Sequence, residues 1–216
     1  MTSESNDLHG MVPDHHDTAV LLIDVINHLD FEGNEELLKI AEKLGKQIAS
    51  LKEAARKLGI PIVYVNDNFG KWKSDFRNVI ENVIEENKPG KPLAKLLLPT
   101  EDDYFVLKPK HSAFYCTPLD ILLNHLGTET LILAGIAGNI CVLFTANDAY
   151  MRNYKIIVPK DCIGSNTSAE NNAALEQMEN ILKADIRPVA EIIKDLKRSA
   201  LRKNSNQEKP DEIIRK

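Results

Sequence analysis

The sequence predicts an α/β fold in which a parallel sheet carries helices on both faces. Short apolar segments alternate with amphipathic segments along most of the 216 residues, and this alternation is typical of parallel strands joined by crossover helices. The first apolar segment, Thr18–Asp24 (TAVLLID), is apolar almost throughout, as expected of a strand buried on both faces. At this length we expect one domain, large enough to bury a core without disulfides or a structural metal.

The remaining elements follow in order from the same patterns. Leucine and alanine side chains recur at helical spacing over residues 34–58, and Gly59 is expected to end this helix. We expect Ser74 to cap the second helix, and a loop over residues 87–92, which contain two prolines and a glycine. The other expected strands cover residues 61–66, 104–108, 130–134, 155–158 and 185–189, and the other expected helices cover residues 75–86, 118–126, 139–152 and 168–182.

Composition and charge narrow the class of protein. We expect a polar lead over residues 1–17, the domain over residues 18–199 and a charged tail over residues 200–216. The lead is unlike a signal peptide, and no apolar run approaches the roughly 20 residues that cross a bilayer. A net charge of −5 argues against a general nucleic-acid binder. We therefore expect a cytoplasmic protein that binds a small-molecule substrate and neither nucleic acid nor membrane.

Three reactive side chains are expected at one edge of the sheet. Ligands of open parallel sheets bind beyond the carboxyl ends of the strands. Asp24 ends the first expected strand, Lys108 ends the third, and Cys141 follows the fourth. Each has an ordinary interpretation alone: a capping carboxylate, a solvated lysine and a small apolar filler. Together they favour a nucleophilic thiol with a carboxylate to move its proton and an ammonium to activate it.

Cys141 is the most informative of the three cysteines. It lies in the segment GIAGNICV, where a strand is expected to turn into a helix. Backbone N–H groups in the first helical turn would lower the thiol pKa and could stabilise an oxyanion. In a compartment that keeps thiols reduced, we interpret Cys116 and Cys162 as structural.

On these residues the chain resembles the isochorismatase-like cysteine hydrolase superfamily, which includes nicotinamidases and N-carbamoylsarcosine amidohydrolase. The resemblance spans about residues 18–189 and is carried by three segments: TAVLLIDVINHLDF, VLKPKHSAFYCTPLDILLNHLG and LILAGIAGNICVLFTANDAYMRNYKIIVPKDCIGS. It implies a three-layer α/β/α sandwich on a six-stranded parallel sheet. Members of this superfamily often form dimers or tetramers, so we expect a homo-oligomer.

The resemblance also implies a mechanism. Cys141 would be the nucleophile, Asp24 the general base and acid, and Lys108 the positive charge that orients and activates. A cis peptide bond is implied between Ile136 and Ala137, with an oxyanion hole formed by the amides of Ala137 and Cys141. The expected function is therefore cleavage of a small amide-type C–N bond through a thioester, without a metal.

The sequence departs from the superfamily at several positions. Nicotinamidases carry a metal site with an Asp-x-His pair and a further histidine, whereas Val25–Lys73 offers only His28. We therefore expect no metal or other cofactor, disfavour nicotinamidase, and interpret all six histidines as surface or loop residues. Ile26 and Ala137 replace the frequent glutamine and threonine, and both changes are expected to remove polar groups from the pocket.

Aromatic residues near the expected crevice are candidates for its walls. The segment NDNFGKW follows the second expected strand and is expected to face the crevice. For each candidate, core packing or a loop cover is the alternative. The candidate pocket residues are Phe31, Asn68, Phe69, Trp72 and Phe114.

Two other functions fit parts of the pattern. A binding or scaffold protein could retain the hydrolase fold without turnover, as the changes at Ile26 and Ala137 suggest. A dinucleotide-binding protein could use Gly135-x-x-Gly138 with Asp161, but the three-glycine pattern is incomplete.

Overall fold

The computed structural model describes residues 15–70, 72–73, 75–86 and 88–207. Its centre is a six-stranded sheet in the order β3-β2-β1-β4-β5, with β6 paired to β4, and all the strand pairs are parallel. The predicted α/β fold is confirmed. The strands are β1 (Thr18–Ile23), β2 (Ile62–Asp67), β3 (Tyr104–Lys108), β4 (Thr130–Ile136), β5 (Lys155–Ile157) and β6 (Ile163–Gly164).

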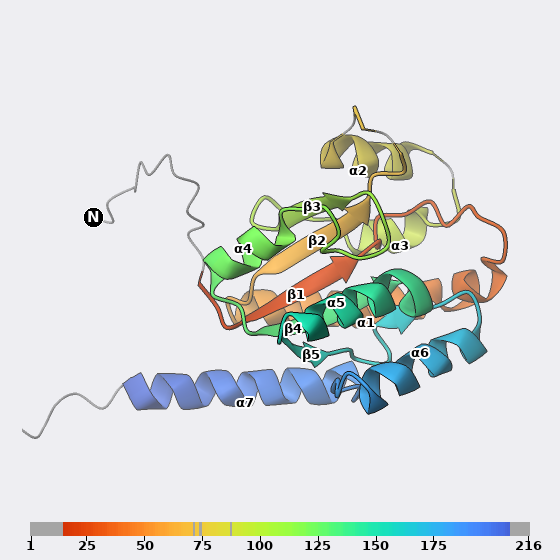
Figure 1. Ribbon diagram of the computed structural model, residues 1–216. Coiled ribbons are helices and arrows are strands. Elements are labelled where there is room, and N and C mark those ends of the chain that lie inside the picture. Colours follow the sequence, from red (N-terminus) through yellow and green to blue (C-terminus); the bar gives the residue numbers. More distant parts are fainter. Residues whose placement is uncertain (1–14, 71, 74, 87, 208–216) are drawn as a thin grey trace, which may run out of the picture.

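Helices cover both faces of this sheet, with α4 and α5 in front and α1 behind it in Figure 1. The buried side chains of α1, α3 and α7 belong to one apolar cluster, and those of α4, α5 and α6 belong to a second. The helices are α1 (Glu35–Lys57), α2 (Phe76–Glu85), α3 (Lys91–Leu96), α4 (Leu119–Leu126), α5 (Leu143–Met151), α6 (Ser168–Asn180) and α7 (Val189–Gln207).

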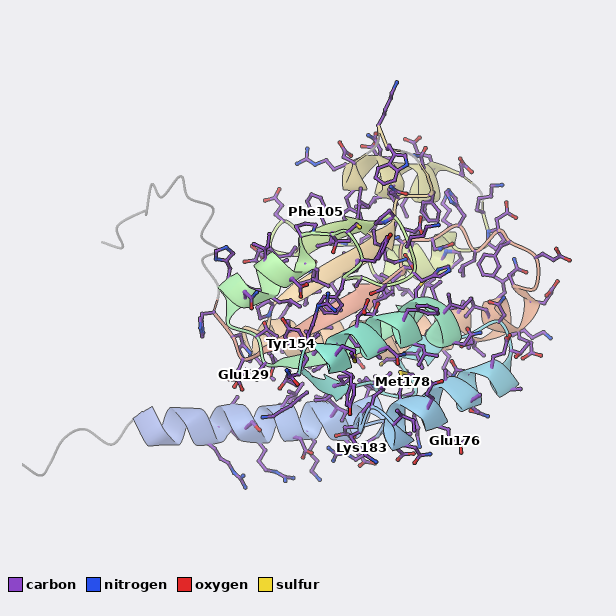
Figure 2. The ribbon with its side chains drawn as sticks, viewed as in Figure 1. Phe105, Glu129, Tyr154, Glu176, Met178 and Lys183 are labelled. Carbon is purple, nitrogen blue, oxygen red and sulfur yellow. The ribbon has the colours of Figure 1, made fainter. Side chains whose placement is uncertain are left out.

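The central strand β1 explains why its sequence is continuously apolar. Val20 and Leu22 pack into the cluster under α1, whereas Leu21 and Ile23 pack into the cluster under α5. Alternate side chains of a strand point to opposite faces, so both sets must be apolar. Met178 of α6 is buried in the second cluster, while Phe105 lies at the β3 edge of the sheet (Figure 2).

Three local expectations were wrong. The sixth strand is β6, not residues 185–189, because Asp185 makes only an isolated bridge to Ile157. The expected loop over residues 87–92 contains the start of α3, whose second residue, Pro92, suits a first helical turn. The cap of α2 is Asp75, which accepts a hydrogen bond from the backbone of Asn78, and Ser74 lies outside the described residues.

The C-terminal end of the described chain differs from the expected domain boundary. Helix α7 continues to Gln207, across the expected boundary at residue 199. Residues 1–14 and 208–216 lie outside the described residues. Within the described part of the chain, no helix is both long enough and apolar enough to span a membrane.

The topology places a binding edge at the carboxyl ends of β1 and β4. From β1 the chain adds β2 and β3 on one side and then continues with β4 on the other side. Such a reversal opens a crevice beyond the strand ends, where ligands of these sheets bind. Asp24 and Ala137 immediately follow β1 and β4, so both residues lie at this crevice.

Candidate active site

Asp24, Lys108 and Cys141 meet at this edge. The Lys108 ammonium nitrogen lies 2.9 Å from Asp24 Oδ2 and 3.5 Å from Cys141 Sγ. It also lies 3.2 Å from the carbonyl oxygen of Lys110, to which it donates. The Lys108 side chain is 0% exposed. A carboxylate, a buried ammonium and a thiol therefore form one contiguous group.

The backbone around Asp24 holds its carboxylate in place. Asp24 leaves β1 with φ at 50°, in the left-handed region that non-glycine residues rarely adopt. Its backbone N–H donates to Val65 (2.9 Å), and its Oδ1 accepts from the backbone N–H of Asp67 (2.7 Å). Both partners belong to β2, so the neighbouring strand fixes both the backbone and the side chain of Asp24.

Cys141 is presented by a single π-helical turn between β4 and α5. This turn covers Gly138–Val142, and turns of this type recur at functional sites. The preceding Ile136–Ala137 peptide bond is cis, at the position that the resemblance implied. The backbone N–H of Asn139 donates to Ser165 Oγ (3.0 Å). This hydrogen bond connects the turn to the segment that follows β6.

Two glycines allow the close contacts around this turn. Gly135 has φ at 129°, and an added Cβ would lie 2.0 Å from the carbonyl oxygen of Ile23. At Gly138 an added Cβ would lie 2.6 Å from Asn171 Oδ1 and 2.9 Å from Ser165 Oγ. No other residue type fits either position without movement of its neighbours.

Burial and mutual charge set the protonation of the three groups. Desolvation and, next, the Asp24 carboxylate raise the pKa of Cys141 to about 12, although Lys108 opposes both effects. Burial also raises the pKa of Asp24, against the attraction of Lys108. The pKa of Lys108 is raised in turn because Asp24 and the Cys141 sulfur outweigh its desolvation.

The expected lowering of the thiol pKa was therefore wrong for the resting site. Cys141 is buried beside a carboxylate, and these two effects on its pKa exceed the opposing effect of the Lys108 ammonium. The resting thiol is protonated, and Asp24 is the neighbouring carboxyl group that can receive its proton.

A cavity of about 330 Å³ opens onto the thiol. Its walls combine the reactive groups with apolar side chains and two asparagines. Residues that line it are Asp24, Asn27, Phe31, Leu37, Asp67, Phe69, His111, Ile136, Ala137, Ile140, Cys141 and Asn166.

Only some of the candidate pocket residues lie in this cavity. Phe31 and Phe69 line it. Asn68 is buried and accepts the backbone N–H of Gly70 (2.9 Å), so it shapes the loop instead. Trp72 is 77% exposed. Phe114 packs in the core, where the Arg152 guanidinium lies 4.6 Å from its ring centroid.

The two departures from the superfamily have different consequences. Ala137 lines the cavity, so this change does lie at the cavity wall. Ile26 is fully buried in the apolar cluster under α1 and is not a lining residue. The expectation that Ile26 removes a polar group from the pocket was therefore wrong.

Sequence reasoning missed two titratable residues of the site. Asp67 ends β2 directly beside Lys108 of β3, and its Oδ2 lies 3.7 Å from the Lys108 ammonium. The strand-end criterion that found Asp24 and Lys108 would also have found Asp67. His111, expected to be an uninvolved loop residue, places Nδ1 3.9 Å from Cys141 Sγ. Its proximity to Lys108 in the sequence was the available signal.

The other two cysteines lie outside the cavity. Cys162 is fully buried in the core, as expected of a structural residue, and burial raises its thiol pKa. Cys116, also interpreted as structural, is exposed, with φ at 53°, so it is not a packing residue of the core.

The part of the chain that the structure describes contains no group of three or more histidine, cysteine, aspartate or glutamate side chains placed to hold a metal ion. The metal site of nicotinamidases therefore does not fit these residues.

Comparison with known proteins identifies the family. Residues 18–194 match the Isochorismatase domain. The chain is 49% identical over 177 residues to the uncharacterized isochorismatase family protein YaaI of Bacillus subtilis, covering 82% of this chain and 97% of that protein. The protein belongs to the isochorismatase family.

Two relatives with named activities are more distant. The ureidoacrylate amidohydrolase RutB of Methylorubrum extorquens is 28% identical over 181 residues, covering 67% of this chain and 68% of that protein. The crystal structure of N-carbamoylsarcosine amidase from Thermoplasma acidophilum has a TM-score of 0.62 and 27% identity, covering 81% of this chain and 97% of that one. Both similarities lie within a family of hydrolases whose fold this chain shares.

Proposed function

We propose that the protein hydrolyses a small amide through a covalent thioester on Cys141. The observation that carries this proposal is the placement of the Cys141 sulfur 3.5 Å from the Lys108 ammonium, which lies 2.9 Å from the Asp24 carboxylate. The amide-cleaving activities named for RutB and for N-carbamoylsarcosine amidase support the same class of reaction.

The first half of the reaction forms the thioester. The Cys141 sulfur attacks the amide carbon while its proton passes to Asp24, so that no free thiolate accumulates in the resting site. Lys108 stabilises the negative charge that develops on sulfur during this transfer. The backbone N–H groups of Ala137 and Cys141 are proposed to stabilise the oxyanion of the tetrahedral intermediate.

The second half releases the products. The C–N bond breaks as Asp24 returns the proton to the leaving nitrogen, which departs as ammonia or an amine. Water then attacks the thioester and gives a proton to Asp24. The C–S bond breaks, the acid is released, and the sulfur recovers its proton from Asp24. The raised pKa of Asp24 suits a group that alternates between base and acid near neutral pH.

The proposal is tested with Cys141→Ala and, as a matched control, Cys116→Ala. Ammonia release from a panel of small amides is expected to fall by at least about a thousandfold in Cys141→Ala. The exposed Cys116 lies outside the cavity, so Cys116→Ala is expected to keep wild-type turnover. Unchanged turnover in Cys141→Ala would exclude this thiol as the nucleophile.

A non-catalytic scaffold is the competing function, and the raised thiol pKa is the observation that favours it. The two functions differ in their response to substrate. A scaffold would bind amides without releasing ammonia, whereas the proposed hydrolase releases ammonia in proportion to the acid formed.

A further inference from the structure

The charged side chains around Lys108 bear on which substrate charge the cavity can accept. Lys108 is one ammonium placed against two carboxylates, with Asp24 at 2.9 Å and Asp67 at 3.7 Å. If Asp24 is ionised, these three groups sum to one negative charge, and if it is protonated they sum to zero. In neither state is there a surplus positive charge.

The Lys108 ammonium is also inaccessible to a ligand in the cavity. The Lys108 side chain is 0% exposed, and its nitrogen is surrounded by Asp24, the carbonyl oxygen of Lys110 and the Cys141 sulfur. Among the described residues, no arginine and no lysine lines the cavity, and His111 is the single basic side chain there. A carboxylate on the substrate would therefore meet no permanent cation.

Asp67 is the more exposed of the two carboxylates beside Lys108. It lines the cavity, and its side chain is 32% exposed, compared with 6% for Asp24. Its Oδ1 accepts the backbone N–H of Phe69 (2.6 Å), which fixes the carboxylate at the base of the loop. Its Oδ2 is 3.7 Å from Lys108, too far for a direct hydrogen bond. Asp67 is thus a fixed, partly solvated negative charge in the cavity wall.

The rest of the cavity suits uncharged groups. Phe31, Leu37, Phe69 and Ile140 supply apolar walls. Asn27 and Asn166 can exchange hydrogen bonds with neutral polar groups. A carboxylate placed here would give up its hydration without an ionic partner, which is costly in a partly buried site.

We propose that the substrate is a small amide that is neutral or cationic beyond its reacting group, and that Asp67 excludes amides bearing a carboxylate. This inference rests on the proposed hydrolase function and specifies its substrate class. Asp67 acts as a specificity-determining residue through repulsion, which specific binding sites use alongside attraction.

The test compares substrates that match in size and differ in charge. Succinamide, succinamate and 4-aminobutanamide carry a similar chain with zero, one negative and one positive charge beyond the amide. Assays are run at pH 8, where histidine side chains are ordinarily uncharged. For the wild-type protein we expect kcat/KM for succinamide and 4-aminobutanamide to exceed that for succinamate by at least about tenfold.

The Asp67→Asn variant tests whether the preference against succinamate depends on Asp67. The substitution keeps an oxygen for the Phe69 N–H and removes the charge, so the succinamide-to-succinamate ratio is expected to fall by at least about fivefold. The ratio within one variant is unaffected by a general loss of activity. Asp102→Asn is the matched control, because it removes the same charge in the exposed turn before β3, and it should leave the ratio within about twofold of wild type.

Binding provides the second measurement and separates the two proposals. Dissociation constants of the three amides for Cys141→Ala, with and without Asp67→Asn, should show the same order of preference. Turnover that persists in Cys141→Ala would refute the proposed mechanism. The charge preference would then be judged separately, from the succinamide-to-succinamate ratio of kcat/KM. A wild-type preference for succinamate, or an unchanged ratio in Asp67→Asn, would overturn the proposal for Asp67.

Discussion

Cys141, Asp24 and Lys108 influence one another's protonation too strongly to be considered separately. Burial is the largest cause of the raised thiol pKa, and the negative charge of Asp24 is the next. The carboxylate proposed to activate the thiol in catalysis therefore also keeps it protonated at rest. Activation consequently requires a proton transfer that accompanies attack on the substrate.

This coupling gives opposite effects of Asp24→Asn on two rates. With the carboxylate charge removed, Lys108 still lowers the thiol pKa, so alkylation of Cys141 at pH 8 should become several times faster than in wild type. Amide turnover should fall by about 10²- to 10⁴-fold because the base is lost. Peptide mass spectrometry after timed alkylation measures the first rate, with the exposed Cys116 as an internal control. Slower alkylation would show that Asp24 favours the thiolate at rest.

The buried ion pair also makes a pH-dependent contribution to stability. Lys108→Met leaves Asp24 buried without its ammonium, which is expected to lower the free energy of unfolding by about 3–5 kcal/mol at pH 8. The folded-state pKa of Asp24, already raised, then rises further, so folding takes up a proton as the pH falls and the deficit shrinks.

Urea unfolding of this variant and of wild type at pH 8 and pH 5 measures the effect. Lys88→Met is the control, since Lys88 forms a partly exposed pair with Asp30, and ion pairs at the surface contribute little to stability. A Lys108→Met deficit that is equal at both pH values would contradict the pKa direction assigned to Asp24.

At the scale of elements, the turn after β4 positions the nucleophile and depends on close backbone packing. Gly135→Ala would place a Cβ 2.0 Å from the Ile23 carbonyl oxygen at φ 129°. Gly59→Ala also has a positive φ, at 67°, but nothing lies within 4 Å of an added Cβ. We expect Gly59→Ala to cost about 1–2 kcal/mol of stability and Gly135→Ala at least about 2 kcal/mol more.

Chemical denaturation of the two alanine variants measures this difference. Since φ 129° is more strained for alanine than φ 67°, the difference reports the clash between β4 and β1 together with the backbone strain at Gly135. Equal losses would show that the contact between Gly135 and Ile23 relaxes without cost.

Strand positions were predictable because fully buried strands are continuous apolar runs, as in β1. The two-residue β6 was not, since Ile163 and Gly164 are too few to give a period. The short helix α3 was hidden for a different reason: its start lies among prolines and a glycine, which resemble a loop.

In the site too, some features follow from the local sequence pattern and others do not. Asp24, Lys108 and Cys141 follow from strand ends, and strand-end logic extends to Asp67. The distribution of Phe31 and Phe69 to the cavity and of Phe114 to the core depends on loop conformation, which no local pattern encodes. The raised pKa of Cys141 depends on burial by residues distant in sequence and required the three-dimensional structure.

For the whole molecule, the sheet topology brings distant segments together at one cavity. Lys108 comes from β3, yet it bonds to Asp24 beyond β1 across the intervening β2. The long side chain of lysine spans this distance, and β2 contributes Asp67 and the backbone that holds Asp24. A homo-oligomeric state stays a prediction, measurable by light scattering in solution.

The central claim, a covalent acyl intermediate on Cys141, is tested most directly by rapid acid quenching during turnover of succinamide or 4-aminobutanamide, followed by mass spectrometry of the protein and its peptides. The account predicts that the protein gains the mass of the acyl group, located on the peptide that contains Cys141 and absent from Cys141→Ala. Sustained hydrolysis by wild type, with the acyl group found on another residue, would contradict it.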